Sequence, residues 1–204
     1  MQIAIIDYGM GNIHSVAKAF EFCGAKAVVT NNKKQIAACQ KIVLPGVGAF
    51  GDAVSELEKQ GLVEFLKEEI KNKKPFLGIC LGLQLLLETS QEAKDKKGLG
   101  VFRGEIVKFS VENKEKIPHM GWNNLNVIAT SCPLLQGVAK EAQVYFCHSY
   151  YPQPVNQEVI AANTVYGVEF GAVLWRENIY GVQFHPEKSQ GVGLKMIRNF
   201  IQAC

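Results

Sequence analysis

The stretch from Lys74 to Glu88 is Lys-Pro-Phe-Leu-Gly-Ile-Cys-Leu-Gly-Leu-Gln-Leu-Leu-Leu-Glu, and it decides how this chain folds. A short apolar run over 76–79 predicts a buried strand that leads directly into Cys80, with an apolar helix immediately after it. Gly78 and Gly82 stand two residues on either side of the cysteine. A sharp strand-to-helix turn needs small neighbours because the backbone doubles back there. The pattern predicts a nucleophile elbow that carries sulfur in place of a serine oxygen.

The chemistry expected at such an elbow comes from the start of the helix that follows it. Free N–H groups, Leu81 first among them, and the positive end of the helix dipole favour a thiolate at Cys80. The same N–H groups can hold an oxyanion. The alternative is a cysteine buried as core filler, because cysteine is among the most buried residue types. The elbow by itself leaves both interpretations open.

A cysteine nucleophile needs a base, and His185 is the best placed of the four histidines. It lies in Tyr180-Gly-Val-Gln-Phe-His-Pro-Glu-Lys188, at the C-terminal end of a strand expected over 179–184. Pro186 turns the chain, which brings Glu187 close enough to orient the imidazole and stabilise its charged form. Nucleophile and base would then meet at the C-terminal ends of neighbouring strands. The alternative is a strand-end histidine held by a local hydrogen bond.

A third segment, Lys41-Ile-Val-Leu-Pro-Gly-Val-Gly-Ala-Phe50, predicts a buried strand that ends at Leu44 and a glycine-rich loop after it. Glycines let the backbone approach a ligand closely. We therefore expect Gly46, Val47 and Gly48 to line a substrate site, with the N–H of Val47 or Gly48 facing that of Leu81. An ordinary strand-to-helix turn is the alternative if the loop is considered alone.

Together these three segments resemble the class I, or triad-type, glutamine amidotransferases. The family combines a Gly-x-Cys-x-Gly elbow with a His-Pro-Glu strand end. The resemblance implies a Cys80–His185–Glu187 triad that hydrolyses the side-chain amide of L-glutamine through a glutamyl thioester and releases ammonia. It also implies that Gln84 helps to bind the substrate. No cofactor and no metal are expected.

Four further strings resemble the members of this family that serve a (β/α)8-barrel cyclase in histidine synthesis: 7–12, 118–123, 145–151 and 185–190. The resemblance implies a heterodimer in which ammonia passes to the cyclase. It implies that the backbone of Ser149 and Tyr150 holds glutamine. It also places four residues at the partner interface: Asn12, Met120, Trp122 and Lys188.

The residues alone say less about these finer motifs. The segment 120–122 is expected as an apolar turn, usually core, and Lys188 as a solvated charge. His148 is expected to be structural because one base suffices, and His14 and His119 are left as structural or interfacial. Ser149 and Tyr150 are expected to end a strand.

Two other functions remain possible at this level: a paralogous glutaminase that feeds a different synthase, for example in surface-sugar modification, and a degenerate, non-catalytic interaction module. The intact triad motifs argue against the module. We also expect low basal activity in the isolated chain, with the loop 45–48 misaligned until a partner binds.

Composition excludes several other classes. The 204 residues suit one domain, 1–204, and 48% hydrophobic with 20% charged residues is a globular balance. The net charge of +3 is dispersed, with basic runs at 33–34, 71–74 and 94–97 in expected loops, and no aromatic-interleaved stripe indicates nucleic-acid binding. The six cysteines show no paired spacing, and no apolar run would span a membrane. The start 1–7 is expected to be a strand and not a signal peptide, so a cytoplasmic protein is predicted.

The coarse pattern predicts an α/β fold, flavodoxin-like, with a mostly parallel central sheet flanked by helices and an antiparallel or mixed β extension. Strands are expected at 3–6, 27–29 and 42–44, and helices at 13–23, 53–71 and 193–204. From about 101 to 184 short β-rich runs follow one another, at 105–109, 125–128, 142–146, 158–163 and 173–175. Gly9-x-Gly11 is rejected as a dinucleotide site because His14 occupies the third glycine position.

Overall fold

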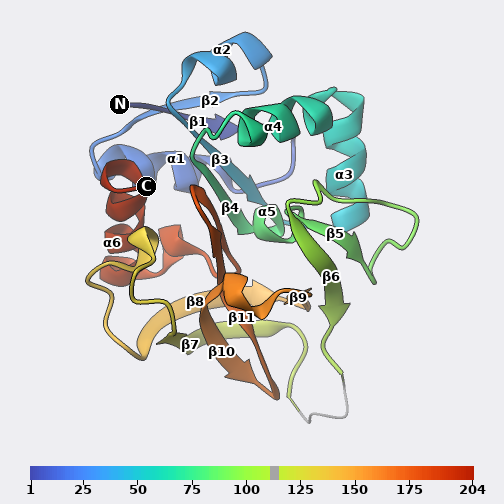
Figure 1. Ribbon diagram of the computed structural model, residues 1–204, viewed down its shortest axis with the longest axis vertical. Helices are drawn as coiled ribbons and strands as arrows, with labels where there is room; N and C mark the ends of the chain where they lie inside the picture. The colour runs from blue at the N-terminus through green and yellow to red at the C-terminus, as the bar shows by residue number, and fades with distance from the viewer. Residues whose placement is uncertain (111–114) are drawn as a thin grey trace.

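The computed structural model describes residues 1–110 and 115–204, and strands alternate with helices only in its first half (Figure 1). The helices are α1 (Ile13–Phe22), α2 (Lys33–Ala38), α3 (Phe50–Lys59), α4 (Leu62–Lys71), α5 (Leu81–Gln84) and α6 (Gln190–Gln202). The 3-10 turns within the described residues are η2 (Pro133–Leu135), η3 (Gln157–Val159) and η4 (Pro186–Lys188). The strands are β1 (Gln2–Ile6), β2 (Lys26–Thr30), β3 (Lys41–Gly46), β4 (Phe76–Cys80), β5 (Leu87–Ser90), β6 (Phe102–Lys108), β7 (His119–Val127), β8 (Ala142–His148), β9 (Tyr150–Pro154), β10 (Ile160–Tyr166), β11 (Val168–Arg176) and β12 (Ile179–Val182).

A nine-stranded sheet in the order β2-β1-β3-β4-β12-β11-β10-β7-β8 runs through the molecule. The pairs from β2 to β12 are parallel, and those from β12 to β8 are antiparallel. A three-stranded sheet, β5-β6-β9, stands beside it. The predicted fold class, a parallel α/β sheet with an antiparallel extension, is confirmed.

Helices cover both faces of the parallel half, because its strands carry apolar side chains on both faces. On one face α1 and α6 pack against Ile3 and Ile5 of β1, and they lie together in Figure 1. On the other face α3 and α4 pack against Ala4 and Ile6. The alternation along β1 therefore divides the core into two layers, and β4, which ends at Cys80, lies in the middle of the sheet.

The single helix expected over 53–71 is wrong. Gly61 adopts a left-handed conformation with φ of 64° and separates α3 from α4. Glycine takes this conformation without a steric penalty, so the helix can end there. The apolar residues of α3 and α4 keep helical spacing on both sides of the break. The helix boundary is therefore a backbone property that side-chain spacing does not reveal.

The apolar helix expected directly after Cys80 is present as the single turn α5, and the chain from Leu87 returns to a sheet as β5. Three smaller expectations fail. Residues 120–122 belong to strand β7 and form no turn. Tyr150 begins β9 and does not end β8, and residues 33–34 start α2. In each case pairing with a distant strand, or a cap such as Asn32 on α2, overrides local composition.

No helix in the described ranges, 1–110 and 115–204, is long and apolar enough to cross a membrane.

Candidate active site

Cys80 occupies a strained backbone position at the point where β4 ends and α5 begins. Its φ is 54° and its ψ is −108°, a region that non-glycine residues rarely adopt and that costs about 1–3 kcal/mol. Strands β3 and β12 pair with β4 on either side, with Gly46 opposite Cys80 and Val182 opposite Ile79. The two ladders hold the strain in place and leave the sulfur at the C-terminal edge of the sheet.

The two glycines that flank the elbow are required by close backbone contacts. A Cβ on Gly78 would come within 2.5 Å of the Gly82 carbonyl oxygen. A Cβ on Gly82 would overlap the carbonyl oxygen of Leu44 in β3. The turn therefore packs backbone against backbone, as its glycine spacing predicts.

His185 lies just beyond β12, where it caps η4. Its backbone N–H donates to the Tyr145 carbonyl over 2.9 Å, and its own carbonyl accepts from the Ser189 hydroxyl over 2.6 Å. The Nδ1 atom lies 2.9 Å from Glu187 Oε1, and both side chains are buried. The 3-10 turn brings the Glu187 carboxylate back to the ring. Hydrogen bonds to its backbone and to Nδ1 therefore hold His185 in place.

The electrostatics of His185 depend on its two polar neighbours. Burial by itself lowers the pKa of an imidazole, but hydrogen bonds to Cys80 and Glu187 outweigh it and raise the pKa of His185 to about 10. Glu187 Oε2 is buried and lacks a hydrogen-bond partner among the described residues. The arrangement thus favours an imidazolium between a sulfur and a carboxylate.

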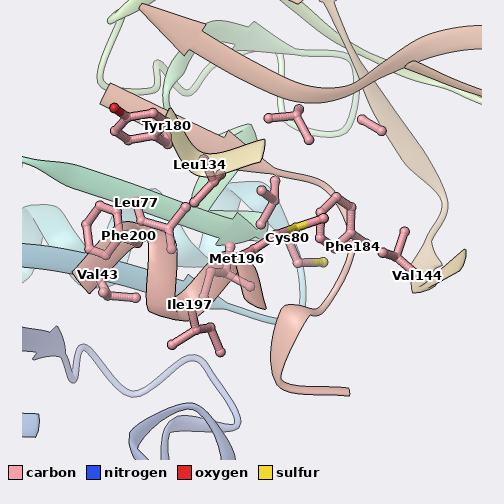
Figure 2. Close-up of a cluster of buried hydrophobic side chains, with 14 of the residues drawn as sticks. Val43, Leu77, Cys80, Leu134, Val144, Tyr180, Phe184, Met196, Ile197 and Phe200 are labelled. Atoms are coloured by element: carbon pink, nitrogen blue, oxygen red, sulfur yellow. The ribbon is translucent and has the colours of Figure 1, made fainter. Parts of the chain in front are cut away.

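Two further polar groups face the sulfur. The Gln183 Nε2 amide lies 3.8 Å from Cys80 Sγ, and the Cys147 carbonyl oxygen lies 3.9 Å from it. Gln183 is completely buried. Cys80 also belongs to an apolar cluster with Phe184 and with Met196 of α6 (Figure 2). The sulfur therefore sits at the boundary between the hydrophobic core and a polar pocket.

A pocket of about 340 Å³ opens over Cys80 and His185. Of the residues expected to bind substrate, it brings together Val47, Gly48, Leu81, Gln84, Ser149 and Tyr150. Gly46 does not line it, because Gly46 is the last residue of β3 and lies buried in the sheet. The loop after β3 remains open to the pocket, and Gly48 adopts a φ of 102°.

Glu92 is a pocket residue that sequence patterns missed. Its carboxylate lines the cavity, and its Oε2 accepts a hydrogen bond of 2.7 Å from the N–H of Phe50, the first residue of α3. Glu92 follows β5 in a charged loop, and nothing in the local sequence distinguishes it from neighbouring solvated charges. Its place depends on the pairing of β5 with β6, which only the folded chain shows.

The four residues expected at a partner interface lie in three places. Met120 and Trp122 point outward from β7 with 61% and 45% of their surface exposed. Lys188 is exposed at the rim of the pocket and lies 5.8 Å from the ring of Tyr145, which in turn contacts the Trp122 ring edge-on. Asn12 is exposed and caps α1.

The family model described as "Glutamine amidotransferase class-I" matches residues 4–204.

The chain belongs to the class-I glutamine amidotransferase family.

Among curated relatives, the "Imidazole glycerol phosphate synthase subunit HisH" of Geobacter sulfurreducens is 50% identical over 204 residues, covering 98% of this chain and 97% of the relative. The protein of the same name from Methanocaldococcus jannaschii is 44% identical and covers 98% of both chains. Solved structures share the fold at lower identity. A chain of PurLQS from Thermotoga maritima matches with a TM-score of 0.77 and 18% identity, covering 98% of this chain and 97% of that chain.

Proposed function

We propose that this chain is the glutaminase subunit of imidazole glycerol phosphate synthase, with one glutamine amidotransferase domain over 1–204. The observation that carries the proposal is the cluster of Cys80, His185 and Glu187 under one pocket, in a chain 44–50% identical to relatives named as this subunit. The proposed reaction is the hydrolysis of L-glutamine to glutamate and ammonia.

In the proposed mechanism the Cys80 thiolate attacks the side-chain carbonyl carbon of glutamine. The oxyanion that forms is held by the N–H of Leu81 and by one from the Val47–Gly48 loop. His185 gives its proton to the departing ammonia, which leaves a glutamyl thioester on Cys80. His185 then takes a proton from water, and the resulting attack cleaves the thioester and releases glutamate.

Glu187 supports both halves of this cycle. Its 2.9 Å contact with Nδ1 orients the ring and leaves the other nitrogen for the hydrogen bond with Cys80. Its charge stabilises the imidazolium, which donates a proton to the departing ammonia in the first half and forms again when the ring takes a proton from water in the second. The raised pKa of His185, about 10, favours the imidazolium as the resting form of the base.

Substrate recognition is assigned to the pocket walls. Gln84 and the backbone at Ser149 and Tyr150 offer hydrogen bonds to the glutamine main chain. Glu92 supplies a carboxylate for the α-ammonium group, because it is an acidic side chain that lines the cavity.

The partner in this proposal is a (β/α)8-barrel cyclase, bound as a heterodimer in the cytoplasm. The exposed side chains of Met120 and Trp122 support the placement of that interface, and Tyr145 links Trp122 to Lys188 at the pocket rim. The cyclase would use the ammonia to make imidazole glycerol phosphate and aminoimidazole carboxamide ribonucleotide in histidine synthesis.

The decisive experiment measures glutamate release by the purified chain, alone and with the cyclase and its substrate. We expect a low basal rate and strong stimulation in the complex, and loss of turnover in Cys80→Ala. A chloroketone analogue of glutamine should label the wild type and Cys147→Ala, a matched cysteine in the same pocket, but not Cys80→Ala. Turnover by Cys80→Ala would refute the mechanism, and labelling without cyclase stimulation would point to another synthase.

A further inference from the structure

Two buried histidines outside the triad form a direct pair. His119 on β7 and His148 on β8 are register partners, with 2% and 6% of their surface exposed. His119 Nδ1 lies 3.0 Å from His148 Nε2. Burying two imidazoles costs free energy unless every ring nitrogen has a partner, so their hydrogen bonds must be accounted for one by one.

The partners determine which nitrogen carries each proton. His148 Nδ1 lies 2.8 Å from the carbonyl oxygen of Tyr150, which only accepts, so Nδ1 must donate. The neutral His148 ring then accepts at Nε2 from His119 Nδ1. His119 in turn accepts at Nε2 from the Asn123 amide over 3.3 Å. With donation running from Asn123 through His119 and His148 to the Tyr150 carbonyl, all four ring nitrogens have a hydrogen-bond partner.

The chain of hydrogen bonds continues into the active site. The carbonyl of Tyr150 also accepts from Gln84 Nε2 over 3.0 Å. Gln84 Nε2 donates as well to Gln183 Oε1 over 3.3 Å, and Gln183 Nε2 faces the Cys80 sulfur. The carbonyl of Tyr150 is therefore the junction between the histidine pair and the amides that border the nucleophile.

Aromatic rings pack against both histidines. The His119 ring is stacked between Phe146 and Tyr166, at centroid distances of 4.6 and 4.0 Å. Phe109 and Phe170 pack against His148 at 5.3 and 5.4 Å. Burial lowers the pKa of His119 to about 4 and that of His148 to about 3. Both rings stay neutral near pH 7, as the donation pattern requires.

We propose that His148, oriented by His119, is a positioning residue that holds the Tyr150 carbonyl, and through it the Gln84 amide, in the geometry that binds glutamine. The proposal deepens the proposed glutaminase function and rests on it. It assigns to the pair a task that an apolar core pair could not perform, because a leucine has no donor for the carbonyl.

The test compares glutamine KM and kcat in the complex with the cyclase for three His148 variants. Asparagine places an amide donor near the Nδ1 position, whereas glutamine places it near Nε2, away from the Tyr150 carbonyl. We expect His148→Leu and His148→Gln to raise KM about tenfold, the effect of one lost hydrogen bond of about 1.4 kcal/mol. His148→Asn should recover most of that loss.

Phe170→Leu is the matched control, since Phe170 packs against the same ring without a hydrogen bond to it and does not line the glutamine pocket. It should lower the melting temperature and leave KM within about twofold of wild type. Equal KM values for all His148 variants, or a tenfold increase in Phe170→Leu, would overturn the proposal. If His148→Leu does not fold, the order of the Asn and Gln variants decides alone. An inactive wild-type complex would instead refute the proposed function.

Discussion

Gly82→Ala tests whether the elbow depends on backbone packing. The new Cβ would overlap the Leu44 carbonyl oxygen and come 2.9 Å from its carbon. Leu44 lies in β3, which is paired with β4 over its length, and Gly82 lies in the single turn of α5. Neither side is a flexible side chain that can rotate away, so the elbow or the strand must move by about 1.6 Å to lengthen the 1.8 Å approach to an ordinary contact of 3.4 Å.

The expected magnitude follows from that displacement. Overpacking in a core costs about 1–3 kcal/mol, and a clash between two backbone segments should fall at the upper end. For a chain of this length about 3 kcal/mol lowers the melting temperature by about 6–12 °C. A shift of about 1 Å at the nucleophile should also reduce kcat by about 100-fold in the molecules that remain folded.

Thermal unfolding and glutaminase assays on the complex check both numbers. Gly191→Ala is the control, since Gly191 is also a helical glycine but has no atom within 4 Å of its added Cβ. It should be neutral or stabilising by up to about 1 kcal/mol. If Gly82→Ala melts within 2 °C of wild type (roughly 0.5–1 kcal/mol) and keeps full activity, the packing argument for the elbow fails.

Four more predictions concern charge and buried polar groups. Glu187→Gln should reduce kcat by about 10- to 100-fold, less than His185→Ala, because orientation and charge are impaired while nucleophile and base remain; steady-state kinetics equal to wild type would contradict this role. Since the folded pKa of His185 is about 10 and the unfolded value about 6.5, its contribution to stability is complete below pH of about 6.5 and is lost as the pH rises toward 10. The melting temperature should therefore decrease less with increasing pH over that range in Glu187→Gln than in the wild type. His148 has a lowered folded pKa of about 3, so unfolding takes up a proton and stability falls as the pH drops below about 6.5, by up to about 1.4 kcal/mol per pH unit. Denaturant titrations at several pH values should show that the free energy of unfolding depends less on pH in His148→Asn, and as in the wild type in the exposed control His14→Gln. Tyr8→Phe should raise stability by about 1 kcal/mol, because the Tyr8 hydroxyl is buried without a partner among the described residues; a less stable Tyr8→Phe in chemical denaturation would indicate a partner for that hydroxyl.

Local patterns in the chain were sufficient for the fold class and for the cluster of Cys80, His185 and Glu187. The glycine spacing around Cys80 predicts a sharp turn from sterics alone, and the structure has that turn. Pro186 forces a bend after a buried run, so Glu187 had to return toward His185. These features depend on neighbours within a few residues, and sequence patterns report such neighbours well.

Contacts between segments that are distant in the sequence could not be predicted from such local patterns. Glu92 reaches the pocket because β5 pairs with β6, and its carboxylate then meets the start of α3. His148 was expected to be structural and His119 structural or interfacial, but their pairing depends on the register of β7 with β8. The break at Gly61 depends on a backbone dihedral that the apolar period of the flanking helices conceals.

The sequence by itself therefore determined the elbow, the base with its acid, and the alternation that builds a parallel sheet, because each follows from sterics or periodicity over a short span. The tertiary structure alone decided which side chains surround the sulfur and how their protons are arranged. Gln183, Gln84 and the Tyr150 carbonyl come from separate strands and turns. Their hydrogen bonds form only when strand register brings these groups together and burial leaves them one another as partners.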